Sequence, residues 1–237
     1  MRKTIALFSG GKDSFYSVQK MLEKGNLDLL ISISSISGDI QLHAGPEATR
    51  EVRKEQLESI GLPYRELVVG VSKDYLHQLF NGLKEIVQNE NAGHIVTGDL
   101  WHPYTGGIGD MLAGALDVKL IRPAREECPS RGYARRYMEK VLGGGIKGVV
   151  VSIRKNDLPP EFLGRKIDPD FLNELEKRNI DLTGESGEYQ SLVVASPLMN
   201  RRILLEDYGV ELVDGKNGKE KFYRMKINRF HTEPRRG

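Results

Sequence analysis

The sequence is poor in cysteine and has no long apolar run. Cys128 is the only cysteine in 237 residues, which excludes an intramolecular disulfide and any Cys-x-x-Cys metal or persulfide chemistry. A lone thiol is typical of a reducing compartment, and no nearby residue favours a nucleophile over a plain buried thiol. We expect no transmembrane helix and no signal peptide. These absences predict a cytoplasmic protein that does not associate with membranes.

Net charge is also scarce. The chain has 35 basic and 33 acidic residues, a formal net charge of +2, so we expect no direct nucleic-acid binding. The locally basic tail around Arg235 is more typical of a solvated terminus. Charged residues make up 29% and hydrophobic residues 39% of the chain, as in ordinary globular proteins. This length is typical of one large domain or two modest ones.

The most informative stretch is the hexapeptide Ser9-Gly10-Gly11-Lys12-Asp13-Ser14. The apolar run Thr4–Phe8 before it predicts a buried strand, and the spacing of Phe15, Val18 and Leu22 after it predicts a helix. Adjacent glycines in such a turn allow a ligand to approach the backbone, and the new helix presents free N–H groups to an anion. With the Lys12 ammonium and the Ser9 and Ser14 hydroxyls, this turn is suited to a polyphosphate. The alternative is an ordinary glycine-rich turn.

Asp13 is unexpected beside phosphates, because its carboxylate repels them unless a cation lies between. This residue therefore predicts Mg²⁺ bridging Asp13 and the phosphates of a nucleotide.

Further strands and helices alternate along the N-terminal part, which predicts a doubly wound parallel sheet. Ligands bind such sheets at the carboxyl ends of the strands. Leu27–Ile36 is a predicted strand that brings Ser34 to this edge, and His94–Thr97 is another, followed by Gly98 and Asp99. Gly98 would allow a ligand to approach closely, and Asp99 could contact ribose, metal or an incoming amine. A turn or helix-capping role for Asp99 is equally open.

Sequence character changes near Ala124, and a second, smaller α+β region is expected. We predict domains at residues 1–130 and 131–237, with the aperiodic segment Glu126–Gly132 as a linker or an active-site loop. A helix is predicted to begin at Pro169, with Asp168 as its N-cap. Four strands are predicted after it: Ser191–Ala195, Arg201–Leu205, Val210–Val213 and Phe222–Ile227.

A second polar motif lies in that region, at Gly184-Glu185-Ser186-Gly187-Glu188-Tyr189. Two carboxylates three residues apart in a glycine-bracketed turn can converge on one cation or on a positive substrate group. The Tyr189 ring could face a quaternary amine, although an aromatic residue that starts a strand is usually core. Acidic turns of this kind can also be merely solvated.

Both motifs match known families. Ser9–Ser14 resembles the PP-loop of the N-type ATP pyrophosphatases, which have an adenine nucleotide alpha hydrolase-like fold. The turn at 184–189, with Pro197-Leu198 after its strand, resembles the C-terminal signature of the diphthine–ammonia ligases, also called the ATP-binding domain-4 family. The order and spacing of these features cover most of the chain.

This resemblance implies an ATP-dependent, AMP-forming ligation. Such enzymes adenylate the carboxylate of diphthine on elongation factor 2, and ammonia then displaces AMP. By resemblance, the ATP site comprises the PP-loop with Ser34, Gly98 and Asp99, and Lys12 and Asp13 would be catalytic. Glu185 and Glu188 would be catalytic and, with Gly184, Gly187 and Tyr189, would bind the acceptor or the ammonium.

Two segments depart from the family pattern. The Tyr-Gln-Arg-x-Arg-x-Glu helix segment is replaced at 101–110, and the aromatic element expected at 38–46 is reduced to Leu42-His43. A different, small-molecule carboxylate therefore stays open as the acceptor, as does a non-catalytic ATP sensor. The oligomeric state is also open, and a homo-oligomer is compatible with the sequence.

Overall fold

The computed structural model describes residues 2–35, 50–70, 74–101, 107–215 and 219–235. Five strands form one parallel sheet in the order β3-β2-β1-β4-β5. Their bounds are β1 (Lys3–Leu7), β2 (Leu29–Ser35), β3 (Tyr64–Val69), β4 (Ala92–Val96) and β5 (Lys119–Ile121). The chain winds outward from β1 to β3 and then returns to the other side of β1, which makes the carboxyl ends of β1 and β4 the switch point where ligands bind.

Helices cover both faces of this sheet because apolar residues alternate between them. In β1, Ala6 packs with α1 (Lys12–Glu23) and α2 (Arg50–Ile60), whereas Ile5 packs with α3 (Tyr75–Asn89) and α4 (Gly107–Ala115). The same alternation occurs in β4, where Val96 and Ile95 face opposite sides. The predicted doubly wound α/β fold is confirmed.

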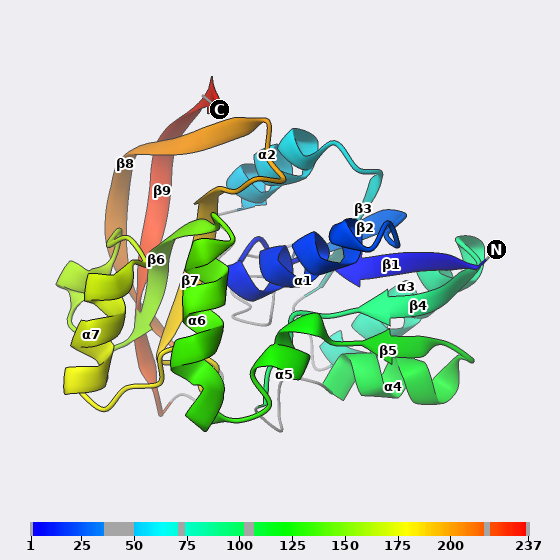
Figure 1. Ribbon diagram of the computed structural model, residues 1–237, viewed down its shortest axis with the longest axis horizontal. Coiled ribbons are helices and arrows are strands. Elements are labelled where there is room, and N and C mark those ends of the chain that lie inside the picture. Colours follow the sequence, from blue (N-terminus) through cyan, green and yellow to red (C-terminus); the bar gives the residue numbers. More distant parts are fainter. Residues whose placement is uncertain (1, 36–49, 71–73, 102–106, 216–218, 236–237) are drawn as a thin grey trace.

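The C-terminal part contains a separate antiparallel sheet, in the order β7-β6-β9-β8. Its strands are β6 (Lys147–Arg154), β7 (Tyr189–Ala195), β8 (Arg201–Asp214) and β9 (Lys221–Pro234). The remaining helices are α5 (Pro123–Glu127), η2 (Arg131–Tyr133), α6 (Ala134–Gly143), η3 (Pro160–Phe162) and α7 (Pro169–Lys177). Figure 1 shows this sheet beside α6 and α7, with α1 lying between it and the parallel sheet.

Three predicted elements differ from the structure. Arg201–Leu205 and Val210–Val213 belong to one strand, because the pairing of β8 with β9 continues through irregularities around Asp207. Glu126–Gly132, expected to be an aperiodic linker or active-site loop, contains the end of α5 and most of η2. Pro123 at the first turn of α5 supports the helix start, because proline is favoured there. As predicted, Asp168 caps α7 by accepting a hydrogen bond from the Phe171 N–H.

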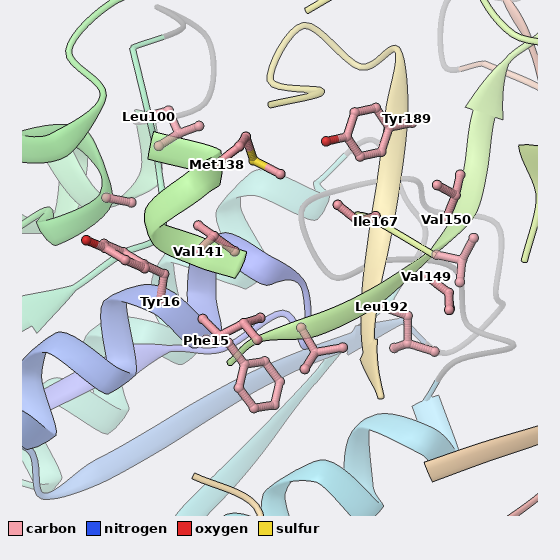
Figure 2. Close-up of a cluster of buried hydrophobic side chains, with 14 of the residues drawn as sticks. Phe15, Tyr16, Leu100, Met138, Val141, Val149, Val150, Ile167, Tyr189 and Leu192 are labelled. Atoms are coloured by element: carbon pink, nitrogen blue, oxygen red, sulfur yellow. The ribbon is translucent and has the colours of Figure 1, made fainter. Parts of the chain in front are cut away.

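One hydrophobic cluster joins the two parts of the chain. Phe15 and Tyr16 of α1 pack with Met138 and Val141 of α6, and the cluster extends to Leu192 of β7 (Figure 2). Helix α1 thus contacts both α6 and β7, and the segment just before it is held between the two sheets. No helix in the described ranges is both long and apolar enough to cross a membrane.

Candidate functional site

The PP-loop connects β1 to α1 at the switch point of the parallel sheet. Gly10 has φ +80°, a left-handed conformation that favours glycine, and a Cβ there would meet the Gln56 Oε1 at 2.3 Å. Gly11 is the N-cap of α1 and provides no side-chain cap. The first N–H groups of the helix are therefore open to partners from outside the loop.

Gly98 allows close contact with this loop. A Cβ at Gly98 would lie 2.7 Å from the Ser14 nitrogen and 2.8 Å from the Asp13 carbonyl carbon. Such a contact involves main-chain atoms, so a larger residue would displace the start of α1. The close approach expected for a ligand at Gly98 is made here by the PP-loop itself.

Lys12 and Asp13 form a buried ion pair at the start of α1. The Lys12 side chain is 4% exposed, and its Nζ lies 2.8 Å from the Asp13 Oδ2. Burial opposes the charged ammonium, but Asp13 and Glu185 favour it, and the pKa of Lys12 is raised. Lys12 thus carries a positive charge at neutral pH. The other carboxylate oxygen of Asp13 accepts a 2.8 Å hydrogen bond from the Tyr137 hydroxyl.

Lys12 also connects the PP-loop to the acidic turn. Its Nζ donates a 2.5 Å hydrogen bond to the Thr183 carbonyl oxygen, at the start of that turn. Gly184 and Gly187 have φ +70° and +88°, so the turn needs glycine at both positions. The Glu185 Oε1 accepts a 3.2 Å hydrogen bond from the Leu100 N–H, just beyond β4. The two motifs predicted from sequence therefore meet, although some 170 residues separate them.

A cavity of about 180 Å³ lies where they meet. It is smaller than the roughly 300–1,000 Å³ of pockets that enclose a drug-sized ligand, and it suits phosphate groups better than a whole nucleotide. Its lining combines both motifs with the start of β7: Ser9, Gly11, Lys12, Asp13, Thr183, Gly184, Glu185, Tyr189, Gln190 and Ser191.

Glu188 and Tyr189, both predicted to bind the acceptor, differ from Glu185 in the contacts of their side chains. Glu188 is absent from the cavity lining. Its Oε2 is buried without a hydrogen-bond partner in the described part of the chain, and burial raises the pKa of its carboxyl group. Tyr189 is only 2% exposed. Its hydroxyl donates to the Leu182 carbonyl oxygen, and the Lys12 ammonium lies 5.4 Å from the centre of its ring.

Ser34 and Asp99 also lie outside the cavity lining. Ser34 is 3% exposed; its hydroxyl donates to Glu66 at 2.6 Å and accepts from Arg53 at 2.7 Å. The Asp99 Oδ2 lies 3.8 Å from the Arg122 Nε, and burial raises the pKa of the Asp99 carboxyl group. His43, a minor substrate-side candidate by sequence, lies outside the described residues, as does the whole of segment 38–46.

The lone cysteine has the surroundings of a core thiol. Cys128 is fully buried, and burial raises the pKa of its thiol to about 12. A thiol of that pKa holds almost no thiolate at neutral pH, so the site offers no cysteine nucleophile.

Sequence reasoning assigned no role to Tyr137, Gln56, Thr183 or Ser191. Tyr137 looks like one more apolar-face residue of α6, and only the packing of α6 against α1 reveals its contact with Asp13. Gln56 is fully buried in α2 and donates to the carbonyl oxygens of Gly10 and Val193. Ser191 lies two residues after Tyr189, the last residue of the acidic motif, and this position was its signal in the sequence.

The described residues contain no cluster of three or more His, Cys, Asp or Glu side chains that could hold a metal ion. Mg²⁺ bound to a nucleotide needs fewer, because it uses one or two carboxylates with phosphates and water. Asp13 fits this requirement because it lines the cavity. Its Oδ1 accepts one hydrogen bond from Tyr137 and its Oδ2 one from Lys12, so each carboxylate oxygen keeps a second lone pair for a cation.

Known proteins resemble this chain over most of its length. Residues 2–111 match the diphthamide synthase N-terminal domain, and residues 134–226 match the diphthamide synthase C-terminal domain. Diphthine–ammonia ligase of Mus musculus is 20% identical over 228 residues, covering 86% of this chain and 83% of that protein. The Schizosaccharomyces pombe protein of the same name is 23% identical over 243 residues, covering 94% of this chain but only 39% of its own length.

Among solved structures, a predicted subunit of tRNA methyltransferase from Methanocaldococcus jannaschii aligns with 83% of this chain and 98% of its own. The TM-score is 0.41 and the identity 15%, values too low to identify a function.

Proposed function

The chain belongs to the diphthamide synthase family and is an ATP-dependent ligase, and from this premise we propose that it amidates diphthine on elongation factor 2. ATP would adenylate the diphthine carboxylate, and ammonia would then displace AMP. The observation that carries the proposal is the Lys12–Thr183 hydrogen bond, because it brings the PP-loop and the acidic turn to one cavity. The proposed acceptor is a translation factor, which suits a cytoplasmic reaction.

The first step needs positive charge at the leaving group. A carboxylate oxygen attacks the α-phosphorus, the bond between that phosphorus and the bridging oxygen breaks, and pyrophosphate leaves with the electron pair. The Lys12 ammonium, charged at neutral pH, and the N–H groups at the start of α1 can stabilise that charge. Mg²⁺ held by Asp13 would neutralise further negative charge on the phosphates when bound.

The second step needs an acceptor site beside the phosphates. Ammonia forms the C–N bond, the bond from carbon to the AMP oxygen breaks, and the nitrogen releases a proton. Glu185 lines the cavity, and we assign to it the binding of ammonium or of the trimethylammonium of diphthine. Water can take up the released proton. Glu188, the second carboxylate predicted to be catalytic, lies outside the lining of this cavity. Tyr189 supports Lys12 through its ring.

The experiment that tests this function measures pyrophosphate release from ATP with Mg²⁺, ammonium and elongation factor 2. Factor carrying diphthine is compared with factor carrying the unmodified histidine. Lys12→Ala should lower the rate by about a hundredfold or more, by analogy with loss of one charge-stabilising donor. Lys20→Ala is the matched control, because Lys20 lies on the same helix and pairs with Glu23 near the surface; its rate should equal that of the wild type.

Each outcome has a defined meaning. Pyrophosphate release that requires diphthine, with AMP and an amidated product, supports the proposal. Release with a small carboxylic acid and none with the modified factor would move the acceptor to the small-molecule alternative. ATP binding without AMP or pyrophosphate would favour a sensor, and inorganic phosphate as the sole product would rule out attack at the α-phosphorus.

A further inference from the structure

We propose that Ser191 is a phosphate-contacting residue, which the C-terminal sheet contributes to the ATP site. Its hydroxyl would accept from the first N–H of α1 and donate to the β- or γ-phosphate of ATP. This inference rests on the proposed use of ATP and adds to it a residue outside the PP-loop.

The position of Ser191 is fixed by contacts between β7 and the PP-loop. β7 is an edge strand of the C-terminal sheet, and the Val193 N–H donates a 3.0 Å hydrogen bond to the Gly10 carbonyl oxygen. Gln56 donates to the carbonyl oxygens of both of these residues, at 2.6 Å to Val193 and 3.1 Å to Gly10. The loop therefore covers the outer edge of β7, and Ser191 is held two residues from this junction.

The Ser191 hydroxyl occupies an anion-binding position. Its Oγ accepts a 3.1 Å hydrogen bond from the Lys12 N–H, the first residue of α1, where the helix N-terminus favours negative charge. A Cβ at Gly11 would lie 3.3 Å from the Ser191 carbonyl oxygen and 3.4 Å from its Oγ, so only glycine leaves β7 room without tight contact. Ser191 lines the cavity together with Lys12 and Asp13.

Ser191 differs from the two serines of the PP-loop in the hydrogen bonds that its hydroxyl group makes. Ser14 donates its proton to the Gly11 carbonyl oxygen at 2.9 Å, and Ser9 donates to Ser14 at 3.2 Å. Both loop hydroxyl protons are thus used within the loop. The Ser191 oxygen is held by the Lys12 N–H, and its hydroxyl hydrogen has no acceptor among the described residues. Such a hydroxyl group can donate a hydrogen bond to a phosphate oxygen in the cavity.

The test compares the binding of Mg²⁺-ATP, AMP and inorganic pyrophosphate by calorimetry. Ser191→Ala should weaken ATP and pyrophosphate binding by about ten- to a hundredfold, the range for a hydrogen bond to a charged group, and leave AMP binding within about twofold. Ser191→Thr keeps the hydroxyl and should restore most of the ATP affinity. Ser196→Ala is the matched control: Ser196 accepts a hydrogen bond from the Leu198 N–H near the same strand and is absent from the cavity lining.

The outcomes separate this inference from the proposed function. If Ser191→Ala binds ATP as the wild type does, or if AMP and ATP weaken equally, Ser191 only caps α1 and the inference is overturned. A lower melting temperature in both alanine variants, with ATP affinity reduced in Ser191→Ala alone, supports it. Wild-type protein that binds ATP and fails to amidate diphthine contradicts the proposed acceptor alone, and wild-type protein that binds neither ATP nor pyrophosphate overturns both.

Discussion

The hydroxyl of Tyr137 donates a hydrogen bond to the Asp13 carboxylate across 124 residues of chain. Asp13 therefore depends on both parts of the protein: α1 places its main chain, and α6 fixes one of its oxygens while Lys12 contacts the other. A carboxylate restrained at both oxygens is preorganised, so little ordering remains when a cation binds.

Replacement of Tyr137 by phenylalanine tests this arrangement. Tyr137→Phe should raise the Mg²⁺ concentration that half-saturates pyrophosphate release by about tenfold, because the Asp13 carboxylate loses one of its two fixed contacts. The measurement is a Mg²⁺ titration at saturating ATP.

Tyr16→Phe is the control. The Tyr16 ring packs edge-on against Tyr137 at 5.2 Å, but its hydroxyl has no hydrogen-bond partner in the described ranges. Its removal should leave the Mg²⁺ dependence unchanged. Equal Mg²⁺ titrations for Tyr137→Phe and the wild type would show that Asp13 needs no support from α6.

Gly98→Ala should move the PP-loop. The new methyl group would meet main-chain atoms of α1 at 2.7 Å, so the strand end and the helix must separate; overpacking of this kind destabilises by about 1–3 kcal/mol. We expect loss of ATP affinity together with a lower melting temperature. Gly114→Ala in α4, where the methyl group meets nothing within 4 Å, should be neutral or stabilising. Wild-type ATP affinity in Gly98→Ala would contradict the requirement for glycine.

Ser34→Ala separates structure from nucleotide binding. The Ser34 hydroxyl joins Glu66 to Arg53, and Arg53 is 2% exposed. Removing the hydroxyl leaves the buried Arg53 guanidinium with one partner fewer, at a cost of about 1–3 kcal/mol. We expect a lower free energy of unfolding with an ATP dissociation constant within about threefold of the wild type, because the side chain already has partners. A large loss of ATP affinity with unchanged stability would show that the hydroxyl itself binds nucleotide.

The Glu188 carboxyl group should make stability depend on pH. Burial raises its folded-state pKa above the ordinary 4.5, so the folded state binds this proton more tightly than the unfolded state does. Its favourable contribution is therefore full below pH 4.5 and is lost as pH rises through the folded-state pKa. Glu188→Gln should unfold at a higher temperature than the wild type at pH 7.5, and this advantage should shrink towards pH 4.

Glu176→Gln is a control of opposite sign. A hydrogen bond from Arg135 lowers the pKa of Glu176, so this group favours the folded state above pH 4.5, and the substitution should lower the melting temperature at pH 7.5. A wild-type advantage over Glu188→Gln at neutral pH would mean that Glu188 is stabilised as a carboxylate.

Local sequence was enough to predict the strand-to-helix turn that forms the PP-loop. Gly10 and Gly11 between an apolar strand and an amphipathic helix specify the turn without information from distant residues, and the alternation of strands and helices specifies the doubly wound sheet. The acidic turn was also recognisable, because its two carboxylates lie in a glycine-bracketed turn just before an apolar strand. The structure gives Gly184 and Gly187 the left-handed backbone that favours glycine.

What the sequence could not supply was the contact between distant segments. Nothing local to Tyr137 or Gln56 distinguishes either residue from other helix positions, since their roles follow from which helices and strands become neighbours. Glu188 illustrates the converse: its spacing from Glu185 suggested a shared cation, but it does not line the cavity that Glu185 does. The extent of β8 depended likewise on pairing with β9, which carries the strand through Glu206–Gly209.

The seating of the β7 edge on the PP-loop limits how the two parts of this protein can be exchanged between relatives. A chimera that joins the first part of one family member to the second part of another would bring together a loop and a strand that had not been matched. We expect such a hybrid to form both sheets but to place the Val193 N–H and the Gly10 carbonyl oxygen incorrectly for their hydrogen bond. Natural variation at positions 10, 56 and 193 should therefore be inherited as a set, and recombination within the family should avoid separating them.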